Sequence, residues 1–410
     1  MNNQLLVVTH AFPPMGGGGV QRIVKFAVYL KQHGWAVTVV CPSPDSYAWI
    51  DEERYKEVVD IPVIRIPLPR MSDSLVAKLN RRLGFIDPFT NWAKDAIKHI
   101  DRLDLSGFAA VLTSGPPHSC HLVGMHLRNQ LGLQWVADFR DHFTLGPEYS
   151  PISIIHRIVN RRFERLIYVR ADHIITNTYT NQLDIIKKFP EINHSNSHVS
   201  TIYNGFDARD LSRSKTVNWD DSLLHLIYLG GLRGDHIDGV FYTLVREAVN
   251  IKPDISNQIM IHVLGDISRK GTLTEELGID DLFDFQTYVP YNEVGSYLAS
   301  ADAGITWQRD RESYRGTVAG KVFDYIGMSL PIFSVGQNDG EIARILTEFK
   351  IGISTSPKNT EQAAADFIQF CDKLRAGEIT YSVEATRTLH EKFDRTSQAL
   401  QLATVLNKLL

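Results

Sequence analysis

The sequence contains few cysteines, and their pattern lacks the signs of a disulfide or zinc framework. Cys41, Cys120 and Cys371 are the three cysteines of the 410 residues, and no Cys-x-x-Cys pair occurs. An odd number at wide spacing argues against both frameworks and favours a reducing compartment. No stretch approaches the roughly 18 uninterrupted apolar residues of a membrane span, and residues 1–14 lack the basic start and long apolar run of a secretory signal. We therefore expect a cytoplasmic protein that can still contact the inner face of the plasma membrane.

The sequence also lacks the short motifs of several common enzyme classes. It contains neither a Gly-x-Ser-x-Gly elbow nor a Walker A motif, which disfavours the commonest hydrolases and nucleotide triphosphatases. The absence of Asp-x-Asp removes the paired acids that hold a metal-bound nucleotide, so no metal site is expected. The net charge is −4, unlike that of a basic nucleic-acid-binding protein. With 43% hydrophobic residues, the composition is that of a globular chain.

Short apolar runs, rich in β-branched residues, alternate with longer helical patterns along the whole chain. Runs of this kind are typical of strands that are buried on both faces of a parallel sheet. In the first half they occupy residues 5–9, 37–40, 63–66, 110–113, 135–137, 173–176 and 199–203. In the second half they occupy residues 224–229, 259–264, 283–288, 303–307, 331–335 and 351–354. The repeated strand–helix units predict an α/β fold of doubly wound parallel sheets with right-handed crossovers.

The strand–helix pattern starts again after a polar, turn-rich segment at residues 204–221, which has the composition of a linker. At roughly 150 residues per domain, the length predicts two or three domains. We expect one domain at residues 1–210 and a second at residues 220–385. The helical pattern that begins at Glu384 continues to the last residue, so residues 386–410 are expected to lie in one long C-terminal helix.

A run of four glycines follows the first predicted strand and precedes a helix. Its members are Gly16, Gly17, Gly18 and Gly19. Without Cβ atoms their backbone can approach a ligand closely, and the helix that begins at Val20 directs its free N–H groups to the same place. An anion or phosphate site is therefore predicted at the carboxyl edge of the sheet. The spacing differs from Gly-x-Gly-x-x-Gly, which disfavours a dinucleotide, and a turn without a ligand is the alternative.

The first strand of the second domain leads into a similar glycine turn, which contains Gly231 and Arg233. The guanidinium group of Arg233 could donate to a phosphate as a planar fork. An arginine on the surface of a turn, without a ligand, is the equally weighted alternative.

Residues 314–331 contain the strongest pattern of the second half. Gly316 and Thr317 suit the start of a helix, and Lys321 falls in its early turns. A cation is unfavourable at that end of the helix dipole, which is explained if an anion binds there. Asp324 shares the helix face with Lys321, and its carboxylate could accept both hydroxyls of a ribose. The alternative is an ordinary Lys–Asp pair on the surface.

Charged residues gather after the predicted strand at residues 135–137. They are Asp138, Arg140, Asp141 and His142. Two carboxylates, an arginine and a histidine in five positions are costly to bury without a purpose, although a structural ion-pair network is the alternative. His118 follows the preceding strand in the sequence Ser-Gly-Pro-Pro-His-Ser. In a doubly wound fold, both clusters are expected to face the cleft between the domains.

Two basic, amphipathic segments are candidates for contact with a membrane. They are residues 75–85 and residues 156–170, the second of which contains five arginines. Such segments can lie on anionic lipid. A solvated helix face is the alternative, and the more frequent one.

Taken together, these motifs resemble the family 4 glycosyltransferases, which are retaining, nucleotide-sugar-dependent enzymes with the GT-B fold. The resemblance rests on FPPMGGGGVQR, SGPPHS, WVADFRDHF, ADHIITNT, YNGFD and GTVAGKVFDYIGMSLPI. It covers nearly the whole length. The FRD and KVFDY elements look like a branch that assembles bacterial cell-surface polysaccharides, such as lipopolysaccharide and capsule.

The resemblance implies two Rossmann-like domains that face each other across a central cleft. The C-terminal domain would bind the donor, a nucleoside-diphosphate sugar with UDP as the default base. The N-terminal domain would bind the acceptor, a saccharide or a lipid-linked saccharide, and residues 386–410 would cross back to this domain. Neither a cofactor nor a metal is implied.

The family's donor-binding residues are matched in part. Asp324 occupies the second acidic position of the family's Glu-x7-Glu motif, which holds the donor ribose, whereas Gly316 occupies the first. Recognition of the transferred sugar would then shift to neighbours such as Arg315 and Thr317. Arg233 matches the arginine that holds the diphosphate, and Asp238 stands where the family has a lysine.

The resemblance also suggests a mechanism. The leaving diphosphate would be stabilised by Arg233, by Lys321 in place of the missing lysine, by the amides near Thr317 and Val318, and by the four-glycine loop. Asp138, Arg140 and Asp141 would orient the acceptor hydroxyl, with Arg140 in the place of a family histidine, and His118 and His142 would lie beside the acceptor. One carboxylate or the leaving phosphate would take the proton.

Two other functions are compatible with the sequence. A nucleotide-sugar epimerase can share this architecture, but would act on the donor without an acceptor. A non-catalytic GT-B subunit that binds sugar is compatible with the missing first Glu at Gly316.

Overall fold

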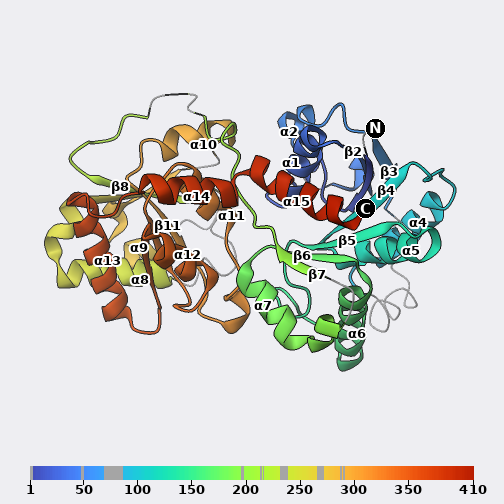
Figure 1. Cartoon of the computed structure of the whole chain (residues 1–410). Helices are drawn as coiled ribbons and strands as arrows, with labels where there is room; N and C mark the ends of the chain where they lie inside the picture. Colours follow the sequence, from blue (N-terminus) through green and yellow to red (C-terminus); the bar gives the residue numbers. More distant parts are fainter. Residues whose placement is uncertain are drawn as a thin grey trace. The chain divides into compact units, whose positions relative to one another are not determined.

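The computed structural model shows two compact α/β units (Figure 1). It describes residues 3–47, 50–68, 86–194, 198–212, 215, 217–230, 239–265, 272–286, 289 and 291–410. Unit 1 consists of Met1–Asn204 together with Arg395–Leu410, and unit 2 consists of Gly205–Asp394. Among the described residues, no helix has the length and apolar character that crossing a membrane requires.

Unit 1 is built on a seven-stranded sheet with the strand order β3-β2-β1-β4-β5-β6-β7, and every pair is parallel. Its strands are β1 (Asn3–Thr9), β2 (Trp35–Pro42), β3 (Val63–Ile66), β4 (Phe108–Gly115), β5 (Gln134–Phe139), β6 (His173–Thr176) and β7 (His198–Thr201). The central strands are buried on both faces, which explains their continuous apolar runs. The chain reverses its direction of winding between β1 and β4, where open α/β sheets bind their ligands.

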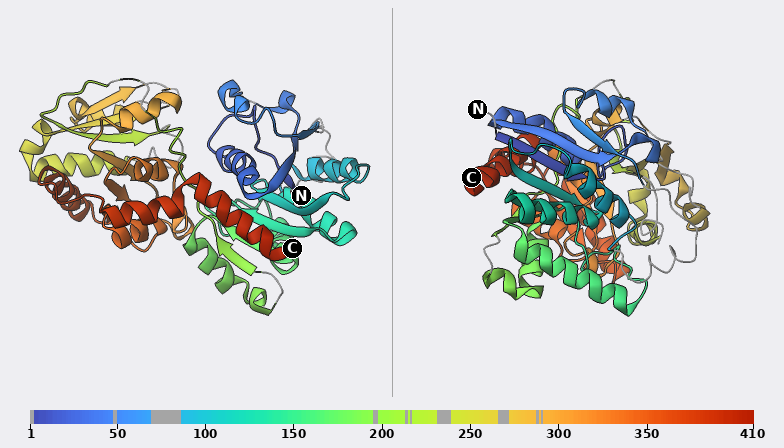
Figure 2. Two further views of the ribbon diagram at one scale, coloured as in Figure 1. Left: turned by 45° about the horizontal axis from the view of Figure 1, so that its top comes forward. Right: turned by 90° about the vertical axis from the view of Figure 1, so that its right-hand side faces the viewer.

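Helices cover both faces of this sheet (Figure 2). One face shares a hydrophobic core with α1 (Gln21–Tyr29) and α15 (Arg395–Leu409), and the other with α4 (Thr90–Ile100), α5 (His121–Leu131) and α6 (Ile154–Arg170). The shorter helices are α2 (Glu52–Lys56), α7 (Tyr179–Lys188), η1 (Leu30–His33), η2 (Pro44–Ser46), η3 (His118–Cys120) and η4 (Pro190–His194).

Unit 2 repeats this architecture with a six-stranded parallel sheet of order β10-β9-β8-β11-β12-β13. Its strands are β8 (Leu224–Leu229), β9 (Ile259–Leu264), β10 (Phe283–Gln286), β11 (Ala303–Trp307), β12 (Ile332–Val335) and β13 (Gly352–Thr355). Its helices are α8 (Val240–Ile251), α9 (Thr272–Glu276), α10 (Tyr291–Leu298), α11 (Gly320–Gly327), α12 (Glu341–Phe349), α13 (Thr360–Arg375), α14 (Val383–Phe393), η6 (Pro253–Asn257), η7 (Asp280–Leu282) and η8 (Glu312–Tyr314). The predicted fold of two doubly wound parallel sheets is confirmed.

The segment at residues 204–221, interpreted from its composition as a linker, lies within unit 2 from Gly205 onward. Phe206 is buried, and its N–H donates to the carbonyl of Phe393 at 3.1 Å. Its ring fills the space beside Gly327, where a Cβ would lie 2.6 Å from the ring. The buried side chain of Phe206 thus anchors the segment at residues 204–221 in unit 2, although the polarity of this segment indicated a linker.

The expectation of one long C-terminal helix is wrong, because α14 ends at Phe393 and α15 begins at Arg395. Asp394, between them, has an extended backbone with φ −70° and ψ 137°. The helix α14 belongs to unit 2, and α15 belongs to unit 1. A single extended residue barely changes the spacing of apolar residues, so the sequence pattern does not reveal the break.

Candidate functional site

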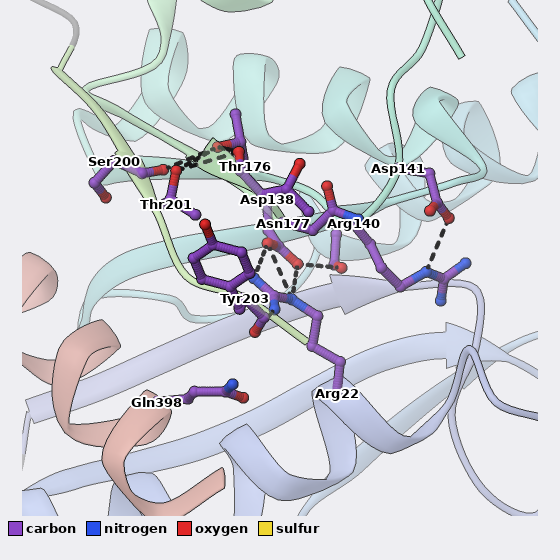
Figure 3. Close-up of polar contacts among 12 residues, drawn as sticks. Arg22, Asp138, Arg140, Asp141, Thr176, Asn177, Ser200, Thr201, Tyr203 and Gln398 are labelled. Carbon is purple, nitrogen blue, oxygen red and sulfur yellow. Dashed lines mark hydrogen bonds and ion pairs between the residues drawn. The ribbon is translucent and has the colours of Figure 1, made fainter. Parts of the chain in front are cut away.

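In unit 1 the predicted clusters meet at the carboxyl ends of β1, β4 and β5. Thr9 on β1 pairs with Ser114 on β4, and Ser114 pairs with Asp138 on β5. Because parallel strands end at a common edge, the four-glycine loop, the turn after Ser114 and the segment after Asp138 are neighbours. This edge is the candidate site of unit 1 (Figure 3).

Asp138 is held in a buried ion pair with Arg22, which comes from the first turn of α1 (Figure 3). The two guanidinium atoms Nε and Nη2 donate to its carboxylate at 3.0 and 2.7 Å, and the hydroxyl of Ser114 donates at 2.7 Å. Arg22 also donates to the carbonyl of Tyr203 at 2.7 Å. Both carboxylate oxygens are therefore engaged, which favours the structural ion-pair alternative for Asp138 over contact with an acceptor.

Arg140 bridges the glycine loop and the turn after β4. Its guanidinium donates to the carbonyls of Gly19 at 2.5 Å and Pro116 at 3.2 Å, and its Nε lies 3.6 Å from a carboxylate oxygen of Asp141. A Cβ on Gly19 would lie 2.7 Å from the guanidinium, so a larger residue there would require the end of the Arg140 side chain to move. Arg140 therefore determines the path of the loop, and Asp141, whose side chain is 53% exposed, is the more accessible carboxylate.

The glycine loop presents backbone rather than side chains. Gly17 has a φ of +105°, which favours glycine, and both Gly17 and Gly18 are exposed, whereas Gly16 is buried. The N-terminus of α1, which begins after Val20, has no side-chain cap and no acidic residue in its first turn. Its N–H groups are compatible with the predicted anion site.

Among the described residues at this edge, four histidines have a buried ring nitrogen without a hydrogen-bond partner: His10, His118, His121 and His142. His118 stacks on Phe143, with ring centroids 4.4 Å apart, and burial lowers the pKa of His118 well below its usual value. Its Nδ1 has no hydrogen-bond partner, and neither ring nitrogen of His142 has one, although Nε2 of His142 lies 3.9 Å from Asp184. His118 and His142 thus keep polar atoms available, and their predicted contact with an acceptor stays a prediction.

His10, directly after β1, was not predicted as a site residue. Its ring lies 4.0 Å from that of Phe89, and its Nε2 has no hydrogen-bond partner. Burial, and secondly the charge of Arg140, lower the pKa of His10 to about 4. Its position immediately after a buried strand, at the edge where ligands bind, is the signal that could have identified it. Arg22, buried in an amphipathic helix, was missed as well.

In unit 2, Lys321 lies in the first turn of α11, beside the end of β8. Its Nζ is 3.3 Å from the centroid of the Tyr228 ring and would be 3.8 Å from a Cβ on Gly230. Burial lowers the pKa of Lys321 well below its usual value. In the part of the chain that the structure describes, this ammonium group contacts an aromatic face and no carboxylate, so the predicted alternative of a surface pair with Asp324 is not what holds it.

The other predicted donor residues lie before or on α11. Thr317 donates its N–H to the carbonyl of Tyr314 at 2.8 Å, so this amide is already engaged, while the side chain of Val318 is buried. Arg315 lies 3.8 Å from Asp339, and Gly316 is buried. Asp324, three residues after Lys321, is partly buried on α11.

Three predictions fall outside the described residues. They concern Gly231, Arg233 and the basic segment at residues 75–85. Within the described ranges, no group of three or more histidine, cysteine or acidic side chains could hold a metal ion. The expectation of a metal-independent protein stays a prediction.

Tyr325 was missed by sequence reasoning, yet it fixes α11 against the sheet. Its hydroxyl accepts the N–H of Leu229 at 3.1 Å and contacts the carbonyls of Ile227 and Ile305 at 3.1 and 3.2 Å. Gly304 makes room for its ring, because a Cβ there would lie 2.3 Å from it. Tyr325 is four residues after Lys321, so its anchoring determines where Lys321 lies.

Comparison with known proteins gives a family match and many structural matches. Residues 17–191 match the model of the glycosyl transferase 4-like domain. Among curated proteins, no relative matches the sequence. The solved structures that match include sucrose-phosphate synthase from Thermosynechococcus elongatus, with 14% identity and a TM-score of 0.69 over 100% of this chain and 99% of that one.

Two further solved structures match over nearly the whole of both chains. WaaG, a glycosyltransferase involved in lipopolysaccharide biosynthesis, is 14% identical with a TM-score of 0.63 over 98% of this chain and 99% of that one. HepE from Anabaena, solved in complex with UDP-glucose, is 14% identical with a TM-score of 0.63 over 99% of each chain. At such low identity these matches show the fold alone, and they confirm the expected GT-B fold.

Proposed function

We propose that the protein is a retaining glycosyltransferase, because residues 17–191 match the model of the glycosyl transferase 4-like domain and the chain has the GT-B fold. It transfers a sugar from a nucleoside-diphosphate sugar to an acceptor hydroxyl in the cytoplasm. The presence of UDP-glucose in the HepE structure supports a UDP-linked donor. The role of WaaG supports an acceptor that is a saccharide or lipid-linked saccharide of a bacterial polysaccharide or glycolipid.

The observation that carries the proposal is the environment of Lys321. A desolvated ammonium group that has no carboxylate partner among the described residues is unfavourable, and an anion that binds beside it offsets that cost. The leaving diphosphate of a sugar nucleotide is such an anion. As the glycosidic bond breaks, the diphosphate gains negative charge, and a fixed cation stabilises this transition state more than the ground state.

The remaining residues have separate roles in the proposal. Asp324 accepts the ribose hydroxyls, Arg315 and Gly316 lie beside the sugar, and Arg233 shares the diphosphate with Lys321. In unit 1, the glycine loop with Arg140 binds an anionic group of the substrates. Asp141, His118 and His142 contact the acceptor. Asp138 acts through Arg22, which positions α1 and the loop that precedes it.

A thermal-shift titration tests the donor site. The wild-type chain is titrated with UDP, GDP, ADP, CDP and dTDP, each with and without Mg²⁺. A ligand at 100 times its dissociation constant stabilises the folded state by about 2.7 kcal/mol. We expect one diphosphate to raise the unfolding temperature without Mg²⁺, and Lys321→Ala to lose this shift. Lys358→Ala is the matched control, because this lysine is 78% exposed and pairs with Asp310.

Product analysis tests the reaction itself. With the matching sugar nucleotide and a saccharide acceptor, NMR of the product should show the same anomeric configuration as the donor. An inverted product would contradict retention, and an epimerised donor formed without acceptor would assign the chain to the epimerases. Binding without turnover across lipid-linked and soluble acceptors would assign it a non-catalytic role.

A further inference from the structure

Two buried histidines of unit 2 are in direct contact with each other. His225 on β8 and His262 on β9 are 5% and 3% exposed, and Nδ1 of His225 lies 2.9 Å from Nε2 of His262. On the neighbouring strand β10, Oδ2 of Asp284 lies 2.9 Å from Nδ1 of His262. The sequence neighbours of all three residues pack in the core of unit 2, so the three side chains share the other face of the sheet.

The side chain of Trp219 covers the two histidines. Its ring is stacked on that of His262, with centroids 3.8 Å apart and an angle of 8° between the planes, and its centroid lies 4.9 Å from that of the His225 ring. The carbonyl of Asp220 lies 2.9 Å from Nε2 of His225. The segment at residues 217–220, which leads into β8, is therefore held against the sheet through the two imidazole rings.

The contact between the two rings limits the number of protons that the pair can hold. Ring nitrogens 2.9 Å apart share one proton, because a second N–H group would point at the first. In this contact the pair carries at most three protons, and the carboxylate of Asp284 balances the charge of the third. Two separated imidazolium rings carry four protons. The separated arrangement therefore binds at least one proton more, and a fall in pH favours it.

The other charged and titratable groups near the pair have partners of their own. Among the described residues they are Lys215 and Asp220 before β8, Glu293 and Tyr297 on α10, and Asp302 before β11. Lys215 and Glu293 pair with each other at 2.5 Å, and the carboxylate of Asp302 accepts the backbone N–H of His225 at 2.7 Å. Burial lowers the pKa of His262, although the hydrogen bond and the charge of Asp284 act in the opposite direction. The buried pair thus takes up protons less readily than free histidines do.

We propose that Trp219, His225, His262 and Asp284 form an acid-released latch, which we call the histidine latch. At neutral pH it holds residues 217–220 against the sheet. Below the ordinary histidine pKa of about 6.5, protonation of both rings separates them and releases the ring of Trp219. Each further unit of pH shifts the equilibrium about tenfold toward the open form for each proton taken up. The inference goes beyond the proposed function, because the latch requires neither donor nor acceptor.

Hydrogen exchange of the full chain, followed by mass spectrometry, tests the latch. The N–H of Leu223 donates to the carbonyl of Asp220 at 3.0 Å, so peptides that cover residues 217–225 report whether the segment is closed. After correction for the intrinsic exchange rate, their protection should fall about tenfold or more between pH 7.5 and 5.5. Peptides from the buried strand β12 should keep their protection and serve as the internal reference.

Two variants should change the pH of release in opposite directions. His262→Gln keeps a polar side chain but cannot be protonated, so most of the fall in protection between pH 7.5 and 5.5 should be lost. Asp284→Asn removes the charge that balances the third proton, so the segment should open at a higher pH than in the wild type. The matched controls, His99→Gln and Asp281→Asn, replace exposed residues and should keep the wild-type profile.

Several outcomes would overturn the latch. One is a wild-type segment that keeps its protection down to pH 5.5, and another is an identical pH profile for the wild type and His262→Gln. Equal loss of protection in β12 would show that unit 2 opens as a whole. If His262→Gln does not fold, Asp284→Asn decides, and an unchanged pH of release would contradict the proposal. The nucleotide titration at pH 7.5 does not depend on the latch, so the two proposals can fail separately.

Discussion

Each unit places a cation in the first turn of a helix at the carboxyl edge of its sheet, but the two cations have opposite surroundings. In unit 1, Arg22 is paired with Asp138 and with the carbonyl of Tyr203, all within the fold. In unit 2, Lys321 contacts the ring of Tyr228. A helix N-terminus disfavours both cations. The fold offsets this cost for Arg22 with its own carboxylate, whereas for Lys321 we propose that a bound anion offsets it.

The largest effect that this comparison predicts is on the stability of unit 1. Asp138→Ala leaves the buried guanidinium of Arg22 without its counter-ion, which costs about 3–5 kcal/mol. Urea unfolding, followed by circular dichroism, should show an early transition. The control is Asp95→Ala, which removes an exposed pair with Lys98 that is worth about 0–1 kcal/mol.

A double variant distinguishes lost charge balance from lost packing. If the unpaired charge is the cause, Arg22→Met in the Asp138→Ala background should recover part of the stability. Equal stability of the single and double variants would show that the pair acts only through packing.

Lys321→Ala should have the second largest effect, and it should appear in activity rather than stability. Removing one preorganised cation from the leaving group should lower kcat/KM by about a hundredfold. The unfolding temperature without ligand should not fall, because none of the described residues gives this ammonium a carboxylate partner. If Lys321→Ala destabilised the protein as much as Asp138→Ala does, the two cations would not differ in their contribution to stability.

The third prediction concerns the stability of unit 1 at acid pH. The pKa of His10, lowered to about 4 by burial and then by Arg140, is below the value of 6.5 that it has when unfolded. The unfolded chain therefore binds a proton that the folded chain does not, so stability is unaffected above pH 6.5 and falls as the pH drops toward 4. The free energy of unfolding is then lower by about 3 kcal/mol once the pH is below 4.

The measurement compares urea unfolding of the wild type and His10→Gln between pH 7 and 4. The variant should lose less stability over this range, whereas replacement of the exposed His99 should leave the slope unchanged. Parallel pH profiles for the wild type and His10→Gln would show that folding does not lower the pKa of His10.

The sequence predicts the fold well because the evidence for it is local. Strands buried on both faces appear as apolar runs, and each expected run coincides with a strand of one of the two sheets. Since parallel strands end at one edge, the same pattern predicts that the glycine loop and Arg140 lie together. The observed bond from Arg140 to Gly19 shows this contact.

The sequence does not reveal contacts that depend on exact register and rotamer. Arg22 and Asp138 are 116 residues apart, and nothing local identifies them as partners. The prediction of Asp138 at the acceptor therefore did not account for Arg22, the cation that is paired with its carboxylate. For the same reason, the sequence does not reveal the environment of Lys321. In the sequence, Tyr228 is only one residue of a predicted buried strand, and nothing indicates its contact with Lys321.

The smallest expected effect concerns the anchor of Lys321. Tyr325→Phe removes a buried hydroxyl that accepts the N–H of Leu229 and contacts two carbonyls, and leaving these groups unsatisfied costs about 1–3 kcal/mol. Because the same hydroxyl fixes α11, the variant should also weaken nucleotide binding. The control, Tyr168→Phe, removes a buried hydroxyl that donates one hydrogen bond to Glu164 in unit 1, whereas α11 belongs to unit 2. Thermal unfolding with and without the nucleoside diphosphate separates the effect on stability from the effect on nucleotide binding. If Tyr325→Phe lost as much stability as the control and bound the nucleotide as the wild type does, Lys321 would keep its position without the hydroxyl of Tyr325.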